Sequence, residues 1–134
     1  MPTFPRAMRL AHAMQFRAVY EARAKRVAGP IAAHVKPNDV GHWRLGLAVG
    51  RHIGTAVVRN RCKRLLREAF RLEREHLPMW MDAGERPCGY DLVIVLRSAE
   101  QATLEGYRRS LRDVAEALHR LWGKRRARDR EQST

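Results

Sequence analysis

Secretion signals, membrane spans and clustered cysteines are all missing from this 134-residue sequence. The first residues, MPTFPRAMRLAHAMQF, carry no continuous apolar run of the kind that directs secretion, so we expect a cytoplasmic protein. No later segment has the unbroken apolar length of a membrane-spanning helix. The two cysteines, Cys62 and Cys88, have no histidine or cysteine neighbours at ligand spacing, which excludes a cysteine-based zinc site and a disulfide framework.

The sequence also lacks the motifs of protein-based catalysis. It contains no P-loop, no Ser-His-Asp spacing above chance, and no histidine-rich or glutamate-rich metal cluster. Glu68 and Asp91 are single carboxylates without a partner in sequence that would complete an acid–base pair. We therefore expect no catalytic residue, no metal site and no cofactor bound by the protein alone.

Acidic residues are few relative to basic ones. Lys and Arg total 27 against 14 Asp and Glu, which gives a net charge of +13 and a pI near 11.2. Such an imbalance on a short chain indicates a polyanionic partner, and arginine suits bidentate phosphate contacts. An anionic membrane surface is the alternative, but it requires a lysine-rich amphipathic helix with a bulky apolar face, which the sequence lacks. Nucleic acid is thus the leading partner.

Length and composition predict one domain over residues 1–134, with nucleic acid as its leading partner. A hydrophobic fraction of 45%, arranged in periodic segments, is sufficient for a single core despite the charge. We expect the ordered core at about residues 8–123 and a frayed basic tail at residues 124–134.

Hydrophobic periodicity predicts a helix and strands in the N-terminal half. The segment HAMQFRAVYEARAK is amphipathic and predicts a short helix that carries Phe16 and Tyr20. IAAHVK is a weak strand candidate, and WRLGLAV alternates large apolar residues with small or basic ones, as a sheet strand does. Gly46 and Ala48 on its second face allow either a helix or a ligand to approach closely. A further short extended segment is expected around Ile53.

From Arg59 the apolar residues recur with a helical period, and nearly all the charged residues are basic. Between residues 59 and 71 there are six basic residues and one acidic residue, and apolar side chains from Cys62 to Phe70 form a stripe. Free N–H groups at a helix start attract phosphate, and Asn60 can bond a backbone, base or sugar edge. A helical wheel gathers one polar row opposite the stripe: Asn60, Lys63, Arg64, Arg67 and Arg71.

The C-terminal half predicts a loop, a strand and a helix. PMWMDAGERPCG, residues 78–89, is typical of a mobile surface loop. YDLVIVL is a continuous apolar run, which predicts a central strand covered on both faces. Thr103 can cap a last helix whose period continues to Trp122. The order of helix, two or three strands, helix, strand and helix makes a single α+β sandwich.

The stretch GTAVVRNRCKRLLREAFR, residues 54–71, closely resembles the Arg-Asn-Arg signature of the protein subunit of bacterial ribonuclease P. FPRAMRL, QFRAVY and LGLAVGRHIG before it, and the helix, Tyr-Asp-Leu-Val strand and final helix after it, are also similar to that family. The resemblance covers roughly residues 4–122. The chain departs from the family at Arg51-His52, where two lysines are usual, and in residues 31–35, which lack an aromatic often found there.

The resemblance implies an α-β-β-β-α-β-α fold with a left-handed β-α-β crossover, shared with a domain of a ribosomal protein and an exception to the usual right-handed rule. It also implies that one protein per RNA binds ribonuclease P RNA and the 5′ leader of precursor tRNA, while the RNA removes the leader with Mg²⁺. Position by position, the residues implied to contact the catalytic RNA are Arg59, Asn60, Arg61, Lys63, Arg64 and Arg67, and the polar row extends them to Arg71. The residues expected along the leader cleft, with the sheet as its floor, are Phe16, Tyr20, Arg51 and His52.

Several alternatives stay open at this point. Aromatics at positions i and i+4 of a helix usually belong to the core, so Phe16 and Tyr20 could pack inside or stack on bases. His52 is either a neutral polar residue or a phosphate contact. Composition alone favours a structural RNA-binding protein of ribosomal type, and a stand-alone nuclease is a third reading. Neither the preferred leader sequence nor the oligomeric state follows from the residues.

Overall fold

A computed structural model of the chain describes residues 4–100 and 102–132. Within these ranges the α-helices are α1 (Ala13–Glu21), α2 (Ala56–Glu73) and α3 (Leu104–Gln132). The strands are β1 (Lys25–Ala28), β2 (Ile31–Pro37), β3 (Arg44–Ala48), β4 (Trp80–Met81), β5 (Pro87–Cys88) and β6 (Tyr90–Leu96). Short 3₁₀ turns are η1 (Arg6–Met8), η2 (Arg51–Ile53) and η3 (Arg74–His76).

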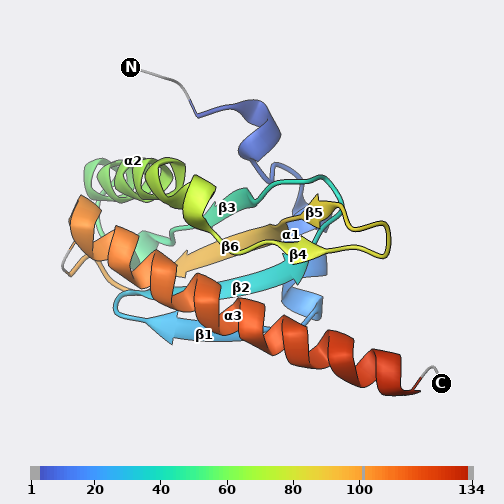
Figure 1. Cartoon of the computed structure of the whole chain (residues 1–134). Helices are drawn as coiled ribbons and strands as arrows, with labels where there is room; N and C mark the ends of the chain where they lie inside the picture. Colours follow the sequence, from blue (N-terminus) through green and yellow to red (C-terminus); the bar gives the residue numbers. More distant parts are fainter. Residues whose placement is uncertain (1–3, 101, 133–134) are drawn as a thin grey trace.

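The main sheet has the order β1-β2-β6-β3, in which β2 pairs antiparallel with both β1 and β6, and β3 runs parallel to β6. Helices α2 and α3 cover one face of this sheet and α1 crosses the other (Figure 1). The chain leaves β3, passes through α2 and returns to β6 by a left-handed crossover (Figure 1). The predicted α+β class, element order and crossover are confirmed.

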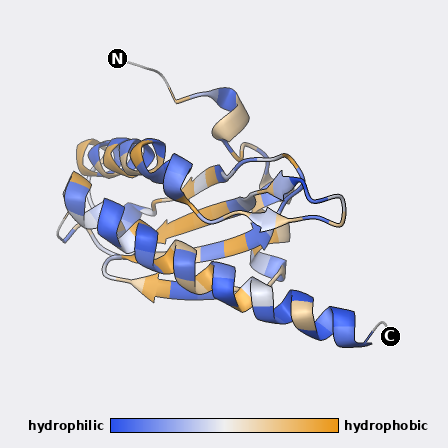
Figure 2. Cartoon of the chain, in the orientation of Figure 1, coloured by the Kyte–Doolittle hydropathy of each residue, from blue (hydrophilic) through white to orange (hydrophobic). Residues whose placement is uncertain are grey.

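The core lies in two layers, one on each face of the sheet. The larger layer packs the apolar stripes of α2 and α3 against the sheet, with Phe70, Tyr90 and Tyr107 fully buried. A smaller cluster under α1 contains Leu10, Val19 and Val93. Because β6 is apolar on both faces from Leu92 to Leu96, it serves both layers, as its apolar run predicted. Figure 2 shows polar residues concentrated on the outer surfaces of α2 and α3. Among the described helices, none combines the length and apolarity that a bilayer crossing requires.

Two predictions in the N-terminal half were wrong in detail. The helix predicted through residues 12–25 ends at Glu21, because Arg23 adopts a left-handed conformation with φ of 52° and redirects the chain into β1. The segment around Ile53 is not a strand but the 3₁₀ turn η2, with Ile53 itself buried. The edge strand β1 escaped prediction because its sequence, KRVA, is mostly exposed and shows no apolar alternation.

Two predictions in the C-terminal half also need correction. Residues 78–89, expected to form a mobile loop, contain the β4–β5 hairpin, and Trp80 Nε1 closes this segment by donating to the carbonyl oxygen of Gly89 at 2.7 Å. Residues 124–132, expected as a frayed tail, continue α3 to Gln132. Arg125 and Arg126 stabilise this extension because their guanidinium groups contact Trp122 and Trp80 respectively.

Glu73 ties the end of α2 to α3. Its carboxylate is buried and accepts hydrogen bonds from Arg108 Nε at 2.8 Å and Arg112 Nη1 at 2.6 Å. Burial by itself would raise the pKa of Glu73, but the bonds from the two arginines outweigh it and lower the pKa below its ordinary 4.5.

Replacing Glu73 with glutamine should therefore reduce the free energy of unfolding at pH 7 by about 1.5 kcal/mol, because two charge-assisted bonds are weakened. A lowered folded-state pKa means that the stabilisation is complete above the ordinary pKa and is lost as the pH falls through the folded-state value. Urea unfolding should thus show a larger difference from the native chain at pH 7 than at pH 3. The exposed Glu116→Gln variant serves as the control, and an equal difference at both pH values would contradict this role.

Candidate nucleic-acid interface

Helix α2 presents its cations on the side away from the core. It begins at Ala56, where the Thr55 hydroxyl accepts a hydrogen bond from the Val58 N–H, and it buries Cys62, Leu66 and Phe70. The helix thus starts three positions before Arg59, contrary to the sequence prediction, and the Arg59 N–H donates to the carbonyl oxygen of Thr55. Residues 59–60 therefore offer a phosphate their side chains and not free backbone N–H groups.

Most of the seven side chains predicted to contact RNA lack a protein partner among the residues that the structure describes. Arg61 and Arg64 are exposed, Lys63 and Arg67 are half-buried, and Asn60 is exposed. Across residues 4–100 and 102–132, none of these five side chains forms an ion pair or hydrogen bond with the protein. The hydrogen-bond donors of these side chains are therefore available to solvent or to an anionic ligand.

Two other members of the predicted set differ from this pattern. Arg71 donates from Nε to Glu68 at 3.0 Å, so this cation already has a carboxylate partner on the same helix. The Nε atom of Arg59 is buried without a hydrogen-bond partner in the described part of the chain. An unsatisfied buried donor on α2 is a group that a ligand oxygen could satisfy.

A small cavity of about 140 Å³ lies beside β3, between α2 and the N-terminal residues on the opposite face of the sheet. Three cations from two segments, Arg9, Lys63 and Arg67, meet around it, and none of the described residues that line it is a carboxylate. Burial lowers the pKa of Arg67, and the positive charge of Arg9 lowers it further. The lining residues are Phe4, Arg9, Leu10, Phe16, Leu45, Gly46, Leu47, Lys63 and Arg67. Three uncompensated positive charges around one hollow favour occupation by an anion.

Helix α1 holds its two aromatic rings over one row of the sheet. Strand pairing aligns Lys25, His34, Val93 and Gly46 in this row. The Phe16 ring lies so close above Gly46 that a Cβ added there would come within 2.6 Å of it, and the Tyr20 ring meets the His34 ring edge-on with centroids 4.8 Å apart. Gly46 is thus the small residue that admits a helix, one of the two possibilities open from the sequence.

The next row of the same face lies beyond the aromatic rings and is formed by Val27, Ala32, Val95 and Ala48. Its members are small or β-branched, and Val27 is 48% exposed. Shortly beyond Ala48 the chain enters η2, whose Arg51 and His52 are exposed. The row thus forms an apolar floor with a cation at its β3 side, although no direct contact within the described residues joins Arg51 or His52 to Phe16 or Tyr20.

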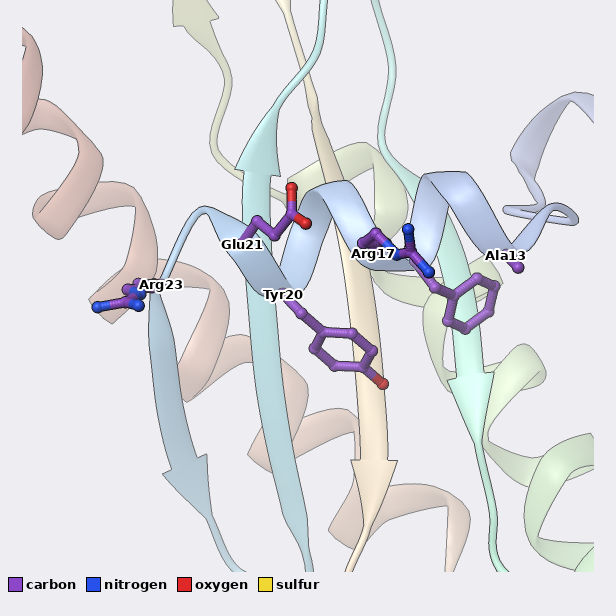
Figure 3. Close-up of a pocket in the computed structure, with 6 residues that line it drawn as sticks. Ala13, Arg17, Tyr20, Glu21 and Arg23 are labelled. Carbon is purple, nitrogen blue, oxygen red and sulfur yellow. The ribbon is translucent and has the colours of Figure 1, made fainter.

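The outer side of α1 borders an open hollow of about 610 Å³ (Figure 3). The residues that line it are Ala13, Phe16, Arg17, Tyr20, Glu21 and Arg23. In this view the Tyr20 ring extends from α1 across the strands, and Arg17 lies on the same helix beside it (Figure 3). Tyr20 is 39% exposed and Phe16 is half-buried, so each ring keeps a surface that a base could cover.

Sequence reasoning missed two groups of this site, Arg9 and His34. Arg9 is held beside β3 by a bridge to Leu45, and Leu10 N donates to the Leu45 carbonyl oxygen at 3.0 Å. His34 supplies a ring on β2, within residues 31–35, the segment that lacks the aromatic residue often found in similar proteins. Burial and the charge of Lys25 lower the pKa of His34, so its ring is neutral at physiological pH.

A family model described as Ribonuclease P matches residues 4–122. The chain belongs to the ribonuclease P family. The ribonuclease P protein component of Azotobacter vinelandii is 36% identical over 132 residues, which cover 97% of this chain and 88% of that protein. That of Desulfovibrio desulfuricans is 34% identical over 119 residues, covering 87% and 85%.

Solved structures of ribonuclease P proteins share the fold. The Staphylococcus aureus protein superposes with a TM-score of 0.67 at 24% identity, covering 84% of this chain and 95% of that one. The Thermotoga maritima protein gives 0.67 at 24% identity, covering 81% and 96%. As a ribonuclease P protein component, the chain is a subunit of a ribonucleoprotein endoribonuclease and assists its RNA in processing the 5′ end of tRNA. Within the described residues, no cluster of three potential metal ligands occurs.

Proposed function

We propose that α2 binds the backbone of ribonuclease P RNA and that the cleft between α1 and the sheet holds the 5′ leader of precursor tRNA. The observation that carries this proposal is one continuous basic and aromatic surface. It runs from the unpaired cations Arg61 and Arg64, through the cavity ringed by Arg9, Lys63 and Arg67, to the Phe16 ring that lines both this cavity and the hollow along α1.

The chemistry of each surface fits its proposed ligand. Folded RNA offers phosphates at close spacing, which guanidinium groups on successive helical turns can neutralise. A leader of variable sequence offers a π-face on every base, so Phe16, Tyr20 and the neutral ring of His34 can hold it without reading its sequence. Arg51 and His52 would meet its phosphates beyond Ala48.

The protein's own residues bind and orient RNA in this proposal, and Mg²⁺ belongs to the catalytic RNA. We infer a single protein per RNA, because one helix face and one cleft serve the two ligands. Neither role requires a proton donor or a nucleophile, which agrees with the lack of paired carboxylates noted in the sequence.

A reconstitution assay tests the proposal against its alternatives. The purified protein, mixed with the cognate catalytic RNA at low Mg²⁺, should increase cleavage of precursor tRNA and the affinity for leader-bearing substrate. A structural protein of ribosomal type would bind RNA without either gain, and a stand-alone nuclease would cleave precursor tRNA without the catalytic RNA.

A further inference from the structure

The last turns of α3 reach back to the end of α1. Arg125, which lies beyond the family-matched residues 4–122, donates from Nη1 to the Ala22 carbonyl oxygen at 2.7 Å and from Nη2 to the Arg23 carbonyl oxygen at 2.8 Å. Its guanidinium group stacks on the ring of Trp122, 4.6 Å from the centroid. Both donor arms and the flat face of this arginine are therefore engaged within the protein.

The segment that Arg125 holds is a sharp corner in the chain. Arg23 has a φ of 52°, a conformation that costs energy for a residue with a side chain, and its N–H donates to the Tyr20 carbonyl oxygen. The carbonyl groups at the end of α1 carry the negative end of the helix dipole. The Arg125 guanidinium group bonds the carbonyl of the C-cap residue Ala22 and that of Arg23 in the corner itself, and so stabilises the corner (the position of Arg23 is seen in Figure 3).

The same turn of α3 also holds the strand under Tyr20. Trp122 Nε1 donates to the Val35 carbonyl oxygen at 2.9 Å, and the Val35 N–H donates to the Ala24 carbonyl oxygen at 3.1 Å. Val35 follows His34, the ring that Tyr20 touches. Both partners of this ring contact thus belong to segments whose backbone is bonded to α3.

We propose that Arg125 is a positioning residue for the leader cleft: by clamping the carbonyl end of α1, it sets the place of the Tyr20 ring over His34. The proposal rests on the proposed function of Tyr20 in leader binding. It assigns a role to the helical extension at residues 123–132, which the family match leaves out.

The test measures binding by the full-length protein assembled with its catalytic RNA. Affinities for leader-bearing precursor tRNA and for mature tRNA are compared for Arg125→Ala, Tyr20→Ala, the double variant and the control Arg128→Ala, whose side chain is exposed on the same helix. We expect Arg125→Ala to weaken precursor binding about fivefold, because a ring displaced by a fraction of an ångström stacks poorly. Mature tRNA binding and the Arg128→Ala variant should match the native protein.

Two readouts separate positioning from other roles. If Arg125 acts through Tyr20, the double variant binds precursor no more weakly than Tyr20→Ala alone, whereas losses that add would overturn the proposal. A direct phosphate contact by Arg125 would instead reduce the slope of log affinity against log salt by about 0.7–0.9, and positioning predicts no change. Arg125→Lys, which retains the charge but neither the fork nor the stacking, should show an intermediate loss and replaces Arg125→Ala if that variant does not fold.

The outcomes also distinguish this inference from the function on which it rests. Unchanged precursor affinity in Tyr20→Ala removes the leader-binding role of Tyr20 and with it the role of Arg125. A loss in Tyr20→Ala without any loss in Arg125→Ala removes only the positioning role.

Discussion

Replacing Arg64 and Arg67 together with alanine is expected to flatten the salt dependence of binding to the catalytic RNA. Each lost phosphate contact lowers the magnitude of the slope of log affinity against log salt by about 0.7–0.9, so the double variant should lose about 1.4–1.8. Neither side chain has a protein partner within the described residues, so the whole effect falls on the bound state. Titrations of labelled RNA at several salt concentrations measure the slope directly.

Two controls locate that effect on α2. The variant with Arg109 and Arg128 changed to alanine removes the same charge from exposed positions on α3, and its slope should change little. Arg71→Ala should change the slope less than Arg64→Ala does, because Glu68 already holds the Arg71 guanidinium group. Equal slopes for the α2 and α3 double variants would show that net charge, and not the face of α2, determines RNA binding.

Local patterns in the sequence were sufficient for the central elements of the fold. β6 was predictable because its five residues from Leu92 to Leu96 are all apolar and three of them are β-branched. α2 was predictable because its apolar stripe and its charges follow one helical period. Prediction failed where structure depends on distant contacts. β1 is a strand only because it pairs with β2. Residues 124–132 contain arginines that contact Ala22, Trp80 and Tyr90, and no local sequence pattern encodes these contacts.

The residues of the candidate site likewise divide into those that a local sequence pattern predicts and those that only distant contacts bring together. The cations of α2 were predictable as one face because they share a helix, whereas Arg9 joins Lys63 and Arg67 only through the path of the N-terminal segment along β3. The pairing of Glu68 with Arg71 could have been predicted from the sequence, because residues three apart on a helix are neighbours. The contact between Tyr20 and His34 could not have been predicted, because it depends on where α1 crosses the sheet.

Phe16 and Tyr20, indistinguishable by periodicity, differ in the structure. Phe16 packs on Gly46 and against the cluster of Leu10, Val19 and Val93, so it belongs partly to the core. Tyr20 contacts the His34 ring in a T-shaped arrangement and keeps 39% of its surface exposed. Each ring can therefore both pack on the sheet and stack on a base. The two positions should nevertheless respond differently to substitution.

Tyr20→Ala is accordingly expected to weaken binding of leader-bearing precursor tRNA by roughly 1–3 kcal/mol, the contribution of one stacked base, while binding of mature tRNA is unchanged. Phe16→Ala should weaken precursor binding and also reduce the free energy of unfolding by about 1–3 kcal/mol, because it opens a cavity above Gly46. Equilibrium binding with both tRNA forms, together with urea unfolding of each free protein, separates the two effects. The control is Met14→Ala on the same helix, where the side chain is 81% exposed and should affect neither quantity. If Tyr20→Ala lowers stability as much as Phe16→Ala and leaves precursor affinity intact, the Tyr20 ring is a core residue and the leader lies elsewhere.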